Sequence, residues 1–373
     1  MKKAVRTSKK IKEIHGHEDT SPCCSEEAAS CCSGDNATCC CGGKPEAVGV
    51  STSLSFQDIL GFCKARWGIN RMNYKVDPGL YYVGQPDANS PVLVTANYKM
   101  SFDSLRKELS GISAWILVLD TKGINVWCAA GKGTFGTAEL IRRIEKTGLP
   151  EVVEHRTLIL PQLGAVGVSA HEVLKKSGFK VVYGPVRAKD IPKFLENGMK
   201  ADKEMRRVRF NFADRAVLTP VEAVSAVKPS LVIFGIMFLL NEVGLTKFTG
   251  TDLYSYIGAV LVGCVLTPML LPWIPGRAFS LKGWLLGLIW AAGVIGINGG
   301  FERNNYDIFM DISYLMILPA VSAYYAMNFT GSSTYTSLSG VLKEMKIAIP
   351  LIAASIGLGL VLLFAGNLMP KLL

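Results

Sequence analysis

The stretch GINVWCAAGKGTFGT (residues 123–137) contains the residue types that could do chemistry. An apolar run leads into Cys128, and a glycine-rich turn follows it before an amphipathic segment begins. Lys132 is four residues from Cys128, and a helix N-terminus predicted near Thr134 adds partial positive charge. Both features favour the thiolate form of a cysteine. The pattern therefore indicates a reactive or metal-binding sulfur, and an inert core cysteine remains the open alternative.

Three familiar cofactor motifs fail on this stretch. A P-loop requires a glycine where the chain has Val126. Residues 131–136 match the dinucleotide pattern G-x-G-x-x-G, but the acidic residues that follow, Glu151 and Glu154, precede the next predicted strand instead of ending it. The histidine motif D-x-H-x-x-G of corrinoid proteins would place an aspartate and a glycine around His171, and neither is present. None of these motifs explains Cys128.

A second group of cysteines lies near the N-terminus, in a polar stretch (residues 1–50) whose composition predicts a disordered tail. Cysteine pairs recur every eight residues in CCSEEAAS, CCSGDNAT and CCCGGKPE. This spacing matches neither ferredoxin nor zinc-ribbon ligand patterns, and adjacent thiols suit soft ions such as Hg(II). The predicted capture residues are Cys23, Cys24, Cys31, Cys32, Cys39, Cys40 and Cys41. A low-complexity tail without a ligand is the alternative.

Residues 51–205 are predicted to form an α/β domain. Short apolar runs at 115–120 and 125–130 predict buried strands, and 137–148 predicts an amphipathic helix that ends at a glycine. Strand and helix patterns then alternate through 157–161, 169–177, 180–186 and 190–198. Strands that alternate with helices of this length are typical of a mostly parallel sheet.

After a linker at 206–222, residues 223–373 are predicted to form an all-α membrane domain. Each apolar span approaches the twenty residues or so that cross a bilayer as a helix. The five predicted spans are 226–245, 252–273, 281–299, 308–328 and 348–369.

The chain carries a formal net charge of +10. Basic residues are concentrated in front of the first span and in the second and fourth loops, and no basic stretch is interleaved with aromatic residues as in a nucleic-acid platform. No apolar segment follows the basic N-terminus as in a secretory signal peptide. We therefore expect no nucleic-acid partner, a multi-pass protein of the cytoplasmic membrane, an N-terminal domain in the cytoplasm and a C-terminus outside.

Three stretches of the sequence resemble a known family. NVWCAAGK resembles the signature of the corrinoid proteins of microbial mercury methylation, the HgcA family. The segment TLILPQLGAVGVSAHEVLKKSGFKVVYGPVRAKDIP is similar to the corrinoid-binding domain of the related corrinoid iron–sulfur protein, and MNFTGSSTYTSLSGV (327–341) resembles the same wider family. The resemblance implies a Rossmann-like α/β corrinoid-binding domain plus an all-α membrane domain of five transmembrane helices. The N-terminal cysteine repeat is outside this family pattern.

The same resemblance implies the site. Cys128 would lie on a cap helix below a cobalamin-type corrinoid as the lower axial ligand of its cobalt, and it would be the catalytic residue. Further cofactor contacts are implied along the signature and in the segment after 157–161. These residues are Asn125, Val126, Trp127, Ala129, Ala130, Gly131, Lys132, Gly133, Thr134, Gln162 and Gly164.

The function implied is methyl transfer from methyl-Co(III) to inorganic Hg(II), which forms methylmercury, so the chain would be a corrinoid-dependent methyltransferase. A soft thiolate opposite the methyl group favours its departure with its electron pair or as a radical. Implied partners are a methyl donor, such as methyl-tetrahydrofolate or a methylated corrinoid protein, and a two-cluster [4Fe-4S] ferredoxin that supplies electrons. A corrinoid methyl carrier of one-carbon metabolism and a membrane transporter with a cytosolic soft-metal domain remain alternatives.

Overall fold

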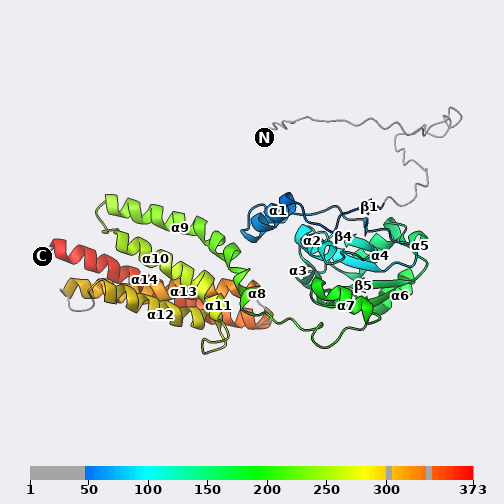
Figure 1. Cartoon of the computed structure of the whole chain (residues 1–373). Coiled ribbons are helices and arrows are strands. Elements are labelled where there is room, and N and C mark those ends of the chain that lie inside the picture. The colour runs from blue at the N-terminus through cyan, green and yellow to red at the C-terminus, as the bar shows by residue number, and fades with distance from the viewer. Residues whose placement is uncertain (1–46, 300–304, 333–337, 373) are drawn as a thin grey trace, which may run out of the picture. The chain divides into compact units, whose positions relative to one another are not determined.

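The computed structural model describes residues 47–299, 305–332 and 338–372. It comprises a helix-covered sheet and a bundle of long helices (Figure 1), which are described in turn. The seven N-terminal cysteines predicted to capture Hg(II) lie outside the described residues, so that prediction stays untested.

In the described part of the chain, six strands form one sheet in the order β1-β2-β4-β3-β5-β6. Neighbouring strands are parallel except β2 and β4, which confirms a mostly parallel sheet. The strands are β1 (Val48–Gly49), β2 (Leu80–Val83), β3 (Val92–Ala96), β4 (Ala114–Leu119), β5 (Thr157–Leu160) and β6 (Lys180–Tyr183). The predicted strands at 115–120, 157–161 and 180–186 are thus confirmed, whereas β1, β2 and β3 were not predicted.

The predicted strand at 125–130 is wrong, because these residues form the helix α3 (Val126–Gly131). Asn125 stands at the N-cap in extended conformation and its side chain accepts a hydrogen bond from the N–H of Cys128. This cap satisfies one of the free N–H groups of the first turn. A short apolar run does not distinguish a strand from a buried helix by periodicity alone.

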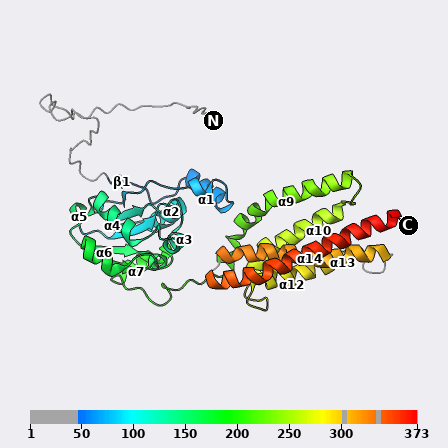
Figure 2. The same cartoon turned by 180° about the vertical axis from the view of Figure 1, so that it is seen from behind.

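Helices cover both faces of the sheet (Figure 2). The predicted helices at 137–148, 169–177 and 190–198 are confirmed as α4, α6 and α7. Gly148 adopts the left-handed conformation, φ +57°, which is common after a helix C-terminus. The helices are α1 (Phe56–Arg66), α2 (Lys99–Lys107), α4 (Thr137–Lys146), α5 (Leu149–Val152), α6 (Ala170–Ser177) and α7 (Ile191–Glu196), with short 3₁₀ turns η1 (Arg71–Asn73), η2 (Gln162–Gly164) and η3 (Ala188–Asp190).

The central strands are buried on both faces, as parallel sheets require. Alternate residues of β3 divide between two apolar clusters: Val92 and Val94 belong to one, and Leu93 belongs to the other. The same alternation separates Leu117 from Ile116 in β4. The continuous apolar runs of these strands therefore reflect burial on two sides.

A second correction concerns the helix that follows the glycine-rich turn. Its N-terminus was predicted near Thr134, but α4 begins at Thr137 with Gly136 as N-cap. Cys128 instead lies in the first turn of α3, with Asn125 as its cap. The positive end of a helix nearest to the sulfur in sequence is therefore that of its own helix.

The helical part contains five helices long and apolar enough to cross a membrane, counted over the described residues, and this confirms the five predicted spans by length and composition. Its elements are α8 (Phe212–Ala216), α9 (Thr219–Glu242), α10 (Gly250–Leu261), a π-helical segment η4 (Val262–Leu266), α11 (Thr267–Leu270), α12 (Phe279–Ile297), α13 (Asn305–Asn328) and α14 (Leu338–Leu372). A Cβ at Gly283 would lie 2.5 Å from the Cβ of Ala326, so the backbones of α12 and α13 approach closely there. The predicted orientation in the membrane stays a prediction.

Candidate functional site

The loop between β4 and α3 is held by one buried asparagine. Asn97 follows β3 directly and is 1 % exposed. Its Oδ1 accepts hydrogen bonds from the N–H of Thr121, at 3.1 Å, and from the N–H of Gly123, at 3.0 Å. The hydroxyl of Thr121 lies 2.8 Å from the same oxygen. The end of β3 thereby fixes the loop that leads into α3.

Glu139 of α4 secures the same loop from another side. Its Oε1 accepts the N–H of Asp120 at 2.9 Å and the guanidinium of Arg143 at 2.8 Å. Burial alone would raise the pKa of Glu139, but the Asp120 N–H and the two arginines Arg143 and Arg142 outweigh it and hold this pKa below its usual value. Glu139 is therefore ionised where it supports the loop.

Cys128 is the third residue of α3. Its N–H donates to Asn125 Oδ1 at 2.9 Å. The thiol is free and half-buried. Helix α3 packs against β3 and against η2, which contains the predicted residues Gln162 and Gly164. A short capped helix thus presents one cysteine at the edge of the sheet.

The remaining predicted residues divide by environment. Ala129 and Ala130 are 0 % and 5 % exposed and pack in the larger apolar cluster, so their side chains face the core. Lys132 is exposed and is the C-cap of α3. Thr134 is half-buried and its hydroxyl donates to the carbonyl oxygen of Ala129 at 3.4 Å. Among these four residues, only Lys132 projects into solvent.

A cavity of about 460 Å³ lies beside α3. Asn125, Val126 and Trp127 line it, together with residues at or just after the carboxyl ends of β3, β5 and β6, such as Thr95 and Gly184. Open α/β sheets bind ligands at this edge, where the carboxyl ends of the strands open toward solvent. Three of the predicted cofactor residues therefore border one cavity, and Cys128 follows them directly in α3.

Three glycines around α3 differ in what explains them. A Cβ at Gly164 would lie 2.6 Å from the buried ring of Phe135, so packing explains that glycine. Gly133 has φ +80°, a conformation that favours glycine. Gly131 has neither a positive φ nor any neighbour within 4 Å of an added Cβ. Among the residues that the structure describes, none requires a glycine at 131.

Two arginines of the cavity were missed by the sequence interpretation. Arg66 ends α1 and Arg71 begins η1, and both line the cavity with Tyr98. The guanidinium of Arg66 lies 5.0 Å from the ring centre of Phe62, and that of Arg71 lies 6.0 Å from the ring centre of Tyr98. These residues are some sixty positions from Cys128 in the sequence, so no local motif links them to it.

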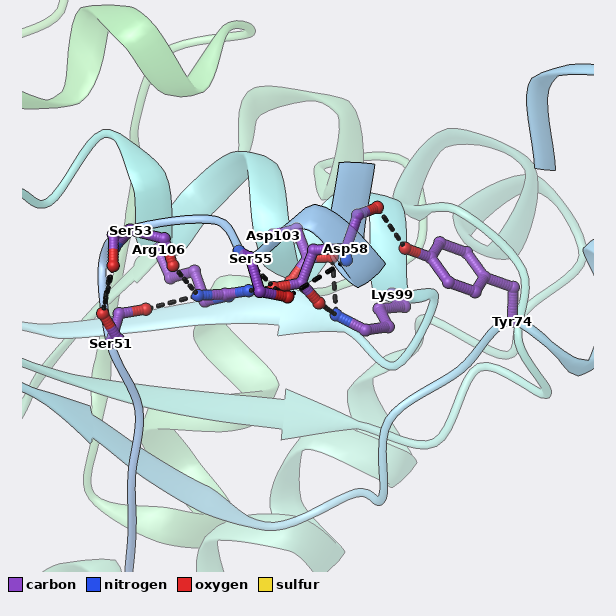
Figure 3. A network of polar contacts seen from close by, with 8 residues as sticks. All are labelled: Ser51, Ser53, Ser55, Asp58, Tyr74, Lys99, Asp103 and Arg106. Atoms are coloured by element: carbon purple, nitrogen blue, oxygen red, sulfur yellow. Dashed lines mark hydrogen bonds and ion pairs between the residues drawn. The ribbon is translucent and has the colours of Figure 1, made fainter. Parts of the chain in front are cut away.

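A different polar cluster joins α1 to α2 (Figure 3). Asp58 binds Lys99 at 2.6 Å and Arg106 at 2.8 Å. Asp103 binds the same two cations, at 2.7 Å and 2.8 Å. Arg106 also donates to the carbonyl oxygens of Ser51 and Ser53, and the side chain of Ser55 caps α1. We call Asp58, Lys99, Asp103 and Arg106 the α1–α2 ion cluster.

Among the described residues, no group of three or more His, Cys, Asp or Glu side chains could hold a metal ion. Within the described part of the chain, Cys128 is thus the candidate metal ligand by position, as a single sulfur beside a cavity.

The α/β part is similar to known proteins. Residues 60–195 match the family model of the CO dehydrogenase/acetyl-CoA synthase delta subunit. Subunits gamma of the acetyl-CoA decarbonylase/synthase complex are 38% identical over 125 residues in Methanopyrus kandleri and 35% identical over 124 residues in Methanocaldococcus jannaschii. The subunit gamma 2 of Methanosarcina thermophila is 37% identical over 125 residues.

These matches are partial. They cover 33%, 33% and 32% of this chain and 26%, 25% and 26% of the three relatives, so the chain spans about a quarter of their length. The delta-subunit family model covers α3, Cys128 and the residues that line the cavity apart from Leu218, and it ends before α8. The region that matches this model is therefore the α/β region that includes the candidate site.

Proposed function

We propose that this chain is a membrane-anchored corrinoid protein that transfers a methyl group to inorganic Hg(II) and so forms methylmercury. The observation that carries the proposal is the free, half-buried thiol of Cys128 on a capped helix beside the cavity at the carboxyl edge of the sheet. The signature NVWCAAGK around it and the five membrane-length helices support the same interpretation.

The residues around α3 fit a large flat cofactor. Gly131 leaves open space where any other side chain would project, and Gly133 adds a further exposed stretch without a side chain. Trp127 and Val126 offer apolar surface on the cavity wall. The donor beside this surface is a single sulfur, as an axial ligand position requires. We propose that Cys128 would supply a sulfur ligand to the cobalt and that Asn125, Trp127 and Gly131 belong to the cofactor site, whereas Gly164 supports α3 through the packing of η2.

A bound corrinoid would supply a cobalt ion that carries the methyl group. Cys128 would act as its axial ligand, because a soft thiolate is a stronger electron donor than the imidazole of histidine. Asn125 would hold the first turn of α3, and with it the sulfur, in place through its cap. The role of Cys128 would be electron donation, which would favour transfer of the methyl group with its electron pair to an electrophile such as Hg(II).

The proposed transfer implies partners. A methyl group that leaves with two electrons takes them from the cofactor, so a separate donor must restore them before the next turnover. We propose a two-cluster [4Fe-4S] ferredoxin as that donor, and methyl-tetrahydrofolate or a methylated corrinoid protein as the methyl source. The helical part would hold the protein in the cytoplasmic membrane with the α/β part on the cytoplasmic side.

A methyl carrier for acetyl-CoA chemistry is the second candidate. The comparisons favour it, because the matched proteins are subunits of the acetyl-CoA decarbonylase/synthase complex. The cobalt ligand and the methyl acceptor distinguish the two candidates. A cobalt that is bound by the sulfur of Cys128 and methylates Hg(II) supports the first. A corrinoid whose methyl group passes to an acetyl-CoA synthase but not to Hg(II) supports the second.

The test uses the full chain, purified in detergent without oxygen and reconstituted with a methylated corrinoid. X-ray absorption at the cobalt edge should show one sulfur ligand in the wild type and none in Cys128→Ala. Methylmercury formation by Cys128→Ala should fall at least a hundredfold. Cys128→His should still bind the corrinoid but lose most of the methylation, because imidazole is the weaker donor.

Cys63→Ala is the matched control, since Cys63 is exposed and is absent from the cavity wall. It should leave both readouts unchanged. An unaltered cobalt spectrum in Cys128→Ala would contradict the proposed ligand, and wild type that binds no corrinoid would contradict the proposed function.

The orientation has its own test. A cysteine introduced after Leu373 should react with a membrane-impermeant thiol reagent added from outside the cell, and one introduced at Lys175 of α6 should not. The reverse labelling pattern would contradict the proposed topology.

A further inference from the structure

The cavity beside α3 contains two cations that form no ion pair with any described residue. Arg66 and Arg71 both line it. Among the ion pairs of residues 47–299, none includes either guanidinium. The Nε of Arg66 is buried and has no hydrogen-bond partner within the described residues. Buried donors are nearly always satisfied, so this exception requires an explanation.

The surroundings of Arg66 are costly for positive charge. Burial, and then the neighbouring charge of Arg71, lower the pKa of Arg66. Aromatic rings support each guanidinium, Phe62 for Arg66 and Tyr98 for Arg71. An aromatic face stabilises a cation only weakly in comparison with a carboxylate or phosphate. The rings therefore orient the guanidinium groups without neutralising them.

The nearest comparison within the same fold is Arg106. It is 6 % exposed, and Asp58 and Asp103 both bind it. At this one arginine the fold supplies two carboxylates. At Arg66 and Arg71 no described carboxylate forms an ion pair, and the two groups share a cavity that is large enough for a ligand group.

We propose that Arg66 and Arg71 form an anion subsite that binds a phosphate or carboxylate group of the molecule held in the cavity. Guanidinium groups present paired N–H donors that match both kinds of oxyanion. Asn125 and Thr95 line the same cavity and add an amide and a hydroxyl group to its polar surface.

Two ligands could carry this anion, and the inference rests on the proposed function for both. A complete corrinoid has a phosphodiester in its nucleotide arm, whereas cobinamide has the same corrin ring without phosphate or nucleotide base. A methyl-folate donor has carboxylates on its glutamate end. The two sources share the chemistry of an oxyanion, and separate arms of one experiment distinguish them.

The experiment compares the full wild-type chain in detergent with Arg66→Gln and Arg71→Gln. Binding of a complete corrinoid, cobinamide and methyl-tetrahydrofolate is measured by absorbance and by quenching of tryptophan fluorescence. We expect the affinity for one anionic ligand to fall at least tenfold in each variant, while the affinity for cobinamide stays within twofold. Loss for the complete corrinoid assigns the subsite to its phosphate, and loss for the folate assigns it to the carboxylates.

Controls separate charge from folding. Arg209→Gln removes an exposed arginine whose ion-pair partner, Glu204, is also exposed, and it should leave every affinity unchanged. Arg66→Lys and Arg71→Lys keep the charge and should retain part of the affinity, and thermal unfolding reports whether each variant folds. Cobinamide affinity in folded Arg66→Gln is the internal check on the corrin site.

Failure of the subsite and failure of the proposed function give different results. If the wild type binds neither corrinoid, the proposed function is wrong. The subsite is then tested by thermal unfolding with inorganic phosphate or methyl-tetrahydrofolate. Either anion should stabilise the wild type and should not stabilise the glutamine variants. If both folded glutamine variants bind every anionic ligand as tightly as the wild type, the subsite does not exist.

Discussion

Two groups of charged side chains in the α/β part are built in opposite ways. The α1–α2 ion cluster contains two cations and two carboxylates, and each side chain binds both partners of opposite charge (Figure 3). The cavity beside α3 contains Arg66 and Arg71 with aromatic rings as their neighbours. Each charge of the first group has counterions within the chain, whereas the two arginines of the second group form no ion pair with a described residue.

The difference separates a structural role from a binding role. A charge removed from water lowers stability when it has no counterion, and a bound anion would remove that cost. The balanced cluster connects helix α1 to helix α2 and needs no ligand. Removing a charge should therefore destabilise the protein at the first group and weaken ligand binding at the second.

The largest effect on stability is expected for Arg106→Gln. This change leaves Asp103, which is 2 % exposed, with Lys99 as its one remaining cation in the cluster. Breaking a buried ion pair from one side typically costs about 3–5 kcal/mol. Thermal and chemical unfolding of the full chain, followed by circular dichroism, should show a loss near the lower end of that range.

Arg66→Gln sharpens the same comparison. Because Arg66 has no carboxylate partner, its replacement should change the unfolding midpoint far less than Arg106→Gln does. A loss of stability as large as that of Arg106→Gln would show that Arg66 is structural, and the contrast between the two groups would disappear.

The next effect is a dependence on pH. Although burial acts to raise it, hydrogen bonds from Lys99, Ser55 and Arg106 hold the pKa of Asp58 well below its usual value near 4. A carboxyl group whose pKa is lower in the folded state contributes stability above its unfolded pKa. That contribution is lost as the pH falls below about 4, toward the folded pKa.

Asp58→Asn should therefore be less stable than the wild type at neutral pH and should lose less on acidification. Glu139 and Asp120, whose pKa values are also lowered, give both proteins a common acid dependence. The difference between the two curves, measured by thermal unfolding from pH 7 to pH 3, isolates Asp58. Parallel curves would contradict its role in the cluster.

Much of the fold could be predicted from the sequence, because long amphipathic or apolar segments carry a clear period. The helix over Thr137–Lys146 and the strand over Thr157–Leu160 are examples. The prediction of a strand at residues 125–130 failed because five apolar residues fit a strand and a helix equally well. The signal that was overlooked is Asn125, an N-cap residue directly in front of the run.

The candidate site was only partly accessible from sequence. Cys128 stood out because it precedes a glycine-rich turn, and residues 125–127 do border a cavity. The role of Arg66 and Arg71 could not be predicted, because it depends on their position in the cavity and on the lack of an ion pair with any described carboxylate. No sequence motif encodes either property. Their only local signal is a pair of arginines among turn residues in RWGINR.

Gly164→Ala should destabilise the protein by about 1–3 kcal/mol, the usual cost of overpacking a core. Its Cβ would lie 2.6 Å from Phe135, whose ring is fully buried and cannot retreat. Thermal unfolding measures the loss. A variant as stable as the wild type would show that the turn at Gln162–Gly164 yields easily and does not support α3 rigidly.

Asn125→Ala should cost about 1 kcal/mol, which is typical for loss of an N-cap. Asn125→Ser restores a cap and should recover most of the stability. Because the cap fixes the N–H of Cys128, the alanine variant should also react faster with a thiol reagent in the absence of ligand. Equal reaction rates for all three proteins would show that the cap does not position the sulfur.

The smallest effect on stability, and the most informative for the site, is expected for Gly131→Ala. An added Cβ would meet no protein atom within 4 Å, and the residue is the last of helix α3. Alanine is the better helix former, so the variant should be equal in stability to the wild type or more stable by a few tenths of a kcal/mol, up to about 1 kcal/mol.

If the space beside Gly131 belongs to a cofactor, the added alanine side chain should weaken corrinoid binding at least fivefold. Gly164→Ala provides the opposite case, in which a loss of stability explains any loss of binding. Corrinoid titration and thermal unfolding of the two variants distinguish these causes, and Gly131→Ala that binds corrinoid as the wild type does would remove Gly131 from the proposed site.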